Sequence, residues 1–168
     1  MRALSDATLL EVASSSWFAA CCVRSLSPSR EACRESLARL PELVLPKRFE
    51  VLSLRALGEE DEARNLAEAY LSGGFEAADP FTRAYLQAAA GQGDAARQTL
   101  ETLPAGAKPY ERAIVFATLG DQEGVVSWLT ASYQGRQRLL RDAAASPEFE
   151  RYSDDPEISA LLLALNRR

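Results

Sequence analysis

The sequence predicts an all-α fold in which helical hairpins stack on one another. Alanine (29) and leucine (24) make up nearly a third of the 168 residues, a bias that favours helices packed closely on helices. A proline, a glycine and an acidic residue also recur together three times, with glycines spaced by 33 and 29 residues. This spacing is typical of the repeats of helical solenoids. We therefore expect residues 1–168 to form a single helical-repeat domain.

Residues 5–45 are expected to form a divergent first hairpin or a cap. Ser5 and Asp6 provide N-cap residues for a helix that runs to about residue 24. Ser27 followed by Pro28 is an N-cap with proline in the first turn, which predicts a second helix. A third helix is expected to begin at Pro46.

Three repeats are expected at residues 46–78, 79–107 and 108–136, aligned on Gly58, Gly91 and Gly120. In each repeat a first helix follows a proline and ends at the glycine, which adopts a positive φ. An acidic residue three positions later stabilises the start of the second helix, as an N-cap or in the first turn. Small side chains on both helices allow a close approach. The prolines are Pro46, Pro80 and Pro109; the acids are Asp61, Asp94 and Glu123; the small residues are Val51, Ala84 and Ala113 before the glycines and Ala63, Ala96 and Val125 after them.

Residues 137–168 are expected to form a C-terminal capping region. The segment Pro147, Glu148 and Phe149 precedes a second helix-start signal. In that signal Asp155 stands before Pro156, an N-cap followed by proline at the first helical position. A closing helix is expected over residues 158–165.

The repeat junctions at residues 55–64, 89–97 and 117–126 resemble the glycine–acid–x–x–alanine junction between the two helices of a tetratricopeptide repeat (TPR). The Pro-x-Phe segment and closing helix resemble the tail of bacterial TPR arrays attached to signalling proteins. The resemblance covers about residues 46–166. It implies a right-handed α-α superhelix whose first helices line a concave groove for a peptide or partner helix. It also implies a non-enzymatic adaptor, scaffold or sensor part of a bacterial signalling system.

In this register the groove-facing positions lie ten and six residues before each glycine, with Arg55 added from the first repeat. The candidate partner-binding residues are Arg48, Leu52, Arg55, Phe81, Tyr85, Tyr110 and Ile114. Arginine and tyrosine are enriched in binding hot spots. Two alternatives stay open: the aromatic residues pack between neighbouring repeats, and the arginines lie on a solvated face or pair with nearby acids. The Lys and Asn pairs of chaperone-binding TPRs do not stand at these positions, so an acidic chaperone tail is not expected.

We predict no catalytic, cofactor or metal site and no enzymatic activity. The chain has no histidine, which removes Ser-His-Asp and Cys-His catalysis and most zinc sites. Cys21, Cys22 and Cys33 are expected as reduced thiols, with two alternatives open: one bridge to Cys33, or a metal site completed by a carboxylate. The acids at residues 59–62 are expected to interact with the helix dipole rather than with a cation.

The expected partner is another protein or a peptide. A net charge of −5 does not favour nucleic acid, and no apolar run is long enough for membrane insertion. The lack of a signal-peptide layout and the odd cysteine count favour the cytoplasm, although the soluble part of a membrane-anchored protein would look the same. The alternative function is a helical regulatory or oligomerisation domain that self-associates, as a homodimer, through Leu161, Leu162 and Leu163.

Overall fold

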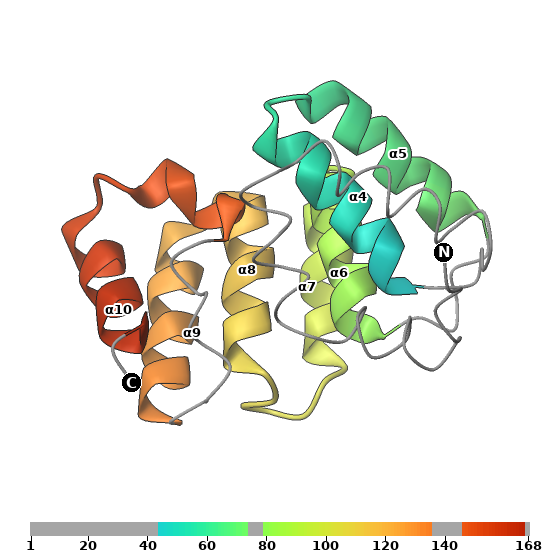
Figure 1. The fold of residues 1–168 in the computed structure, drawn as a ribbon. Helices are drawn as coiled ribbons and strands as arrows, with labels where there is room; N and C mark the ends of the chain where they lie inside the picture. Colours follow the sequence, from blue (N-terminus) through green and yellow to red (C-terminus); the bar gives the residue numbers. More distant parts are fainter. Residues whose placement is uncertain (1–43, 74–78, 136–145, 167–168) are drawn as a thin grey trace, which may run out of the picture.

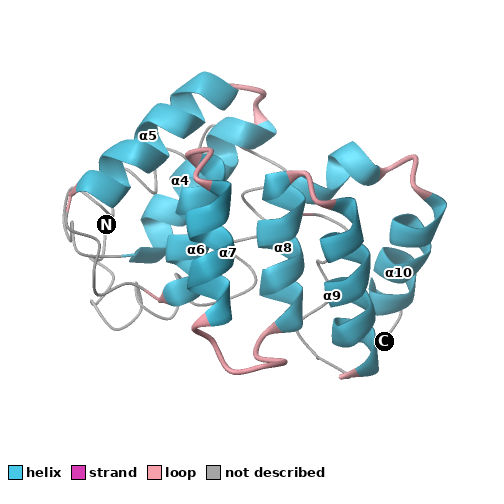
Figure 2. Cartoon of the chain, turned by 180° about the vertical axis from the view of Figure 1, so that it is seen from behind, coloured by secondary structure: helices cyan, strands magenta, loops and turns pink. Residues whose placement is uncertain are grey.

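The computed structural model describes residues 44–73, 79–135 and 146–166, and every regular element in these three ranges is a helix (Figure 2). The expected helices within residues 5–43 and all three cysteines lie outside the described residues. The elements are α4 (Val44–Ala56), α5 (Glu60–Ser72), α6 (Pro80–Ala89), α7 (Gly93–Glu101), α8 (Pro109–Leu119), α9 (Gln122–Gln134), the 3₁₀ helix η2 (Pro147–Tyr152) and α10 (Pro156–Asn166). The all-α prediction is confirmed for this part of the chain.

Consecutive helices pair, α4 with α5, α6 with α7 and α8 with α9. The pairs follow one another along the molecule in chain order (Figure 1). Their first helices are neighbours, since α6 contacts both α4 and α8. Helix α10 packs against α9 at one end of the molecule, whereas η2 contacts α8 and α4. The tail therefore has two parts that pack in different places.

Two of the three predicted helix starts are confirmed. Pro80 and Pro109 are the first residues of α6 and α8, where the missing N–H needs no partner. The Asp79 side chain accepts a hydrogen bond from the backbone N–H of Thr82 (3.3 Å) and so caps α6. The prediction for α4 was wrong by two residues, because this helix begins at Val44 and includes Pro46 in its first turn. Proline is tolerated there for the same reason.

The three predicted glycine junctions share one hydrogen-bond pattern. Gly58, Gly91 and Gly120 have φ values of 78°, 78° and 75°, which confirms the expected left-handed conformation. After each glycine, the next N–H donates to the carbonyl five residues earlier, the longer bond of a Schellman motif. These bonds run from Glu59 to Leu54 (2.9 Å), from Gln92 to Gln87 (2.8 Å) and from Asp121 to Phe116 (3.0 Å). Local sequence thus sets each reversal of direction.

The second helices begin as predicted, with acids in the first turn. Asp61, Asp94 and Glu123 each occupy the second helical position rather than the N-cap. The N-cap of α9 is Asp121, which accepts a hydrogen bond from the N–H of Gly124 (3.0 Å). All six small residues expected at the helix contacts are at most 1% exposed, which confirms their place in the core: Val51, Ala63, Ala84, Ala96, Ala113 and Val125.

Candidate interaction face

The apolar candidates belong to the core. Leu52, Phe81 and Ile114 are 6%, 3% and 5% exposed. For Phe81 the packing alternative therefore describes the structure. The Lys108 ammonium lies 4.9 Å from the centroid of the Phe81 ring and forms an ion pair with Asp79 (3.7 Å). Leu52, Phe81 and Ile114 therefore pack inside the core and do not offer a surface to a partner.

The four polar candidates lie together, on one face of α4, α6 and α8. We call Arg48, Arg55, Tyr85 and Tyr110 the first-helix face. The Arg48 guanidinium lies 5.2 Å from the centroid of the Tyr85 ring, a cation–π distance. Arg55 forms an ion pair with Glu60 (3.2 Å), and the Arg55 side chain is only 14% exposed. The ion-pair alternative thus holds for Arg55.

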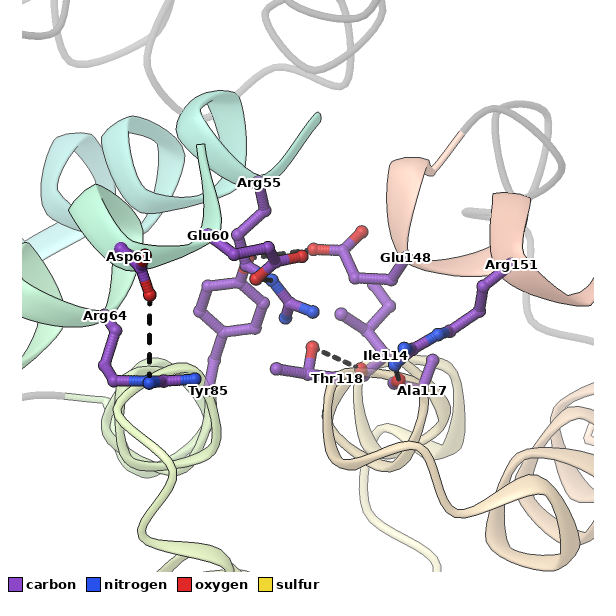
Figure 3. A network of polar contacts seen from close by, with 10 residues as sticks. All are labelled: Arg55, Glu60, Asp61, Arg64, Tyr85, Ile114, Ala117, Thr118, Glu148 and Arg151. Carbon is purple, nitrogen blue, oxygen red and sulfur yellow. Dashed lines mark hydrogen bonds and ion pairs between the residues drawn. The ribbon is translucent and has the colours of Figure 1, made fainter. Parts of the chain in front are cut away.

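Helix η2 covers this face. The buried Tyr85 hydroxyl donates a hydrogen bond to Glu148 Oε1 (2.9 Å). The second carboxylate oxygen of Glu148 accepts from the Ser146 hydroxyl (2.5 Å). The Phe149 ring lies 6.0 Å from that of Tyr110 at an interplanar angle of 46°, within the range of favourable aromatic pairs. Figure 3 shows Glu148 pointing from η2 toward Tyr85, with Arg55 and Glu60 beside them.

Burial keeps the two tyrosines protonated and therefore able to donate. Burial raises the pKa of Tyr85 well above its usual value, and the nearby charge of Glu148 raises it further. The pKa of Tyr110 is raised in the same way, first by burial and then by Glu148. Burial lowers the pKa of Arg55, but nearby groups, among them the carboxylates of Glu60 and Glu148, raise it by more, so the pKa is raised overall. The first-helix face is therefore cationic and rich in donors.

Two donors of this face remain without an acceptor in the part of the chain that the structure describes. They are Nε of Arg48 and Nη1 of Arg55, and both atoms are buried. A buried donor without a partner costs about 1–3 kcal/mol. Glu148 is thus a good but incomplete match for the face, because it satisfies the tyrosine and not both guanidinium groups.

Sequence reasoning named the Pro147–Glu148–Phe149 segment but did not connect it with the groove residues. Tyr85 and Glu148 are 63 residues apart, so no helical period relates them. One sequence feature could have indicated the contact: Glu148 and Phe149 are an acid and an aromatic residue, which are complementary to the arginine and tyrosine side chains of the first helices. Arg151 adds an interaction at the end of α8, where its guanidinium donates to the Ala117 carbonyl (3.5 Å; Figure 3).

Within residues 44–73, 79–135 and 146–166, no group of three or more Cys, Asp or Glu side chains has the arrangement of a metal site. In the same ranges no helix has the length and apolar character needed to cross a membrane. Comparison of this sequence and structure with family models, curated proteins and solved structures gave no match.

Proposed function

We propose that this chain is a non-enzymatic protein-interaction module of TPR-like hairpins, stacked as a right-handed superhelix, that binds a peptide or partner helix on its first-helix face. An adaptor, scaffold or sensor role in a bacterial signalling system follows from the resemblance of the repeats and tail. The domain division into repeats at residues 46–78, 79–107 and 108–136 belongs to the same proposal.

One observation carries the proposal. A short non-repeat segment, Pro147–Tyr152, lies across the first helices of three successive pairs and contacts α4, Tyr85 of α6 and α8. The face already holds one short segment of the chain, through a buried tyrosine donor and an aromatic contact, which supports the proposal that it binds such segments. TPR-type grooves bind extended segments or helices with the same first helices.

Matched charge reversals test the proposal. The chain is used as bait in a lysate of its host, and retained proteins are identified by mass spectrometry. Arg48→Glu reverses a charge on the first-helix face, whereas Arg64→Glu reverses one on α5, where the side chain is 56% exposed. We expect a partner that binds the wild type and Arg64→Glu and is lost from Arg48→Glu. Circular dichroism and urea unfolding check that both variants are folded.

A partner retained equally by all three proteins would place the contact elsewhere and contradict the proposed face. The lack of any retained protein would contradict the interaction function itself and favour self-association.

Self-association is the second candidate, and one residue favours it. Leu163 on α10 is 54% exposed. The expected exposed stretch at residues 161–163 is otherwise covered, since Leu162 is only 8% exposed and a substitution there would disturb the core. Light scattering of the wild type beside Leu163→Asp separates the candidates. A dimer that this change converts to a monomer supports self-association, and a wild-type monomer contradicts it.

A further inference from the structure

We propose that the first-helix face selects segments in which a carboxylate is followed directly by an aromatic residue, and that Ser146–Tyr152 is an internal ligand of this kind that competes with the partner. This inference rests on the proposed function, because it names the chemistry of the partner that the same face binds. Its consequence is regulatory: a partner binds only by displacing η2.

The separation of the tail into two parts is the first argument. The end of the helix row is covered by α10, which packs against α9. Capping the last pair therefore does not require η2, which instead lies back over α4 and α8. The position of η2 is that of a ligand on the face rather than that of a cap at the end.

The carboxylate position has specific partners. Glu148 is 6% exposed, and a buried carboxylate is retained only where donors and cations compensate its desolvation. Tyr85 supplies the hydrogen bond, and its raised pKa keeps the proton on the donor. Arg55 supplies positive charge beside both groups. A neutral amide at this position would lose the charge-assisted part of the hydrogen bond.

The aromatic position is adjacent and equally specific. Phe149 is 3% exposed and its ring lies against that of Tyr110. An acid and an aromatic side chain in consecutive positions thus fit two neighbouring sites, one on α6 and one on α8.

The internal segment leaves room for a better competitor. Nε of Arg48 and Nη1 of Arg55 are buried without an acceptor in the described ranges. An outside segment with a second carboxylate near the first would satisfy these donors, which the internal segment does not. Because binding requires the open face, the apparent affinity of any partner is reduced by the fraction of molecules in which η2 is displaced.

The test uses a fluorescent peptide with the sequence of residues 146–153 and the full chain in three forms. Glu148→Arg places a third positive charge beside Arg48 and Arg55 and weakens the internal segment. Glu150→Arg makes the same charge change at an exposed position of η2 and serves as the matched control. Fluorescence anisotropy should show at least about tenfold tighter peptide binding to Glu148→Arg than to the wild type or to Glu150→Arg. A peptide with Gln at the Glu148 position should bind Glu148→Arg about tenfold more weakly than the original peptide.

Equal peptide binding to all three chains, or no binding to a folded Glu148→Arg chain, would overturn the inference. A second measurement needs no variant. In wild-type chain with millimolar unlabelled peptide, hydrogen exchange of the amides in residues 146–152 should become faster, and unchanged exchange would equally overturn it. If the bait experiment finds a partner that depends on Arg48 while the peptide fails both measurements, the interaction function stands and only the acid–aromatic preference is refuted.

Discussion

At Gly124 the structure leaves no room for a side chain. It lies in the first turn of α9, where a helical residue other than glycine is normally favoured. A Cβ atom at this position would lie 2.2 Å from Cδ1 and 2.7 Å from Cγ of Phe116 on α8. Gly124→Ala therefore tests how closely the two helices of one pair approach.

The expected magnitude combines two opposing effects. Overpacking a well-packed site costs about 1–3 kcal/mol, whereas replacing glycine by alanine within a helix gains about 1 kcal/mol. The clash is with Cγ as well as with Cδ1, so a rotation of the ring about its own axis does not relieve it. The difference is about 0–2 kcal/mol, and because ring rotation does not relieve the clash we expect the upper half of this range, about 1–2 kcal/mol of net destabilisation.

Urea unfolding followed by circular dichroism measures this difference, and Gly93→Ala is the matched control. Gly93 is the first residue of α7, and its Cβ would meet the nearest atoms at 3.5 Å, an ordinary contact distance. The control should therefore be stabilised by up to about 1 kcal/mol.

The second test of the same contact removes the opposing ring. In a Phe116→Ala background the clash is absent, so Gly124→Ala should become stabilising by up to about 1 kcal/mol. If Gly124→Ala destabilises both backgrounds equally, the ring contact is not the cause and the close approach of α8 and α9 is refuted.

Four further measurements follow from the structure. Tyr152→Phe removes a buried hydroxyl that has no hydrogen-bond partner among the described residues, so its free energy of unfolding should stay equal or rise by up to about 1 kcal/mol, and a loss of 1 kcal/mol or more in urea would contradict this. Burial raises the pKa of Tyr85 and of Tyr110, so above about pH 10 these tyrosines lose their protons in the unfolded chain but keep them in the folded chain. The free energy of unfolding should be unaffected by these two groups below this pH and should fall above it by about 1.4 kcal/mol per pH unit for each tyrosine. Urea unfolding at several alkaline pH values should show this fall, and Tyr85→Phe should reduce its slope. The Arg112 guanidinium donates to three backbone carbonyls between α7 and α8 and lies 4.6 Å from the centroid of the Trp128 ring. In urea unfolding, Arg112→Lys should therefore lower the free energy of unfolding by about 1–3 kcal/mol. A change below about 0.5 kcal/mol would show that a lysine ammonium can replace the several donors of the guanidinium. Gly91→Ala meets no atom within 4 Å but keeps φ at 78°, so thermal unfolding should show a loss of about 1–2 kcal/mol from backbone strain alone.

The helix pairs could be predicted from the sequence because their signals are local. Proline at a helix start and glycine at a helix end act within one turn. The same signals recur at Gly58, Gly91 and Gly120, and each gives the same hydrogen bonds in the structure. The early start of α4 was missed because proline in the first turn does not distinguish the first helical position from the third.

The composition of the first-helix face could be predicted only in part. The periodic register placed Arg48, Arg55, Tyr85 and Tyr110 on one face, and they do lie together. The burial of these four side chains depends on η2, a 3₁₀ helix of six residues that is too short to show a hydrophobic period of its own. A contact between positions 63 residues apart is decided by tertiary packing, which short-range patterns do not encode.

The position of η2 also affects the cooperativity of the fold. In a stack where each helix pair contacts mainly its neighbours, the free energy of unfolding is approximately a sum of contributions from the pairs and from the interfaces between them. Here η2 contacts both α4 and α8, and Glu148 within it bonds to Tyr85 on α6, so one short segment joins three successive pairs. Displacing this segment removes contacts from all three pairs at once. In the binding mode proposed above, a ligand that takes its place restores these contacts, so that proposal links occupation of the first-helix face to the cooperative stability of the three helix pairs.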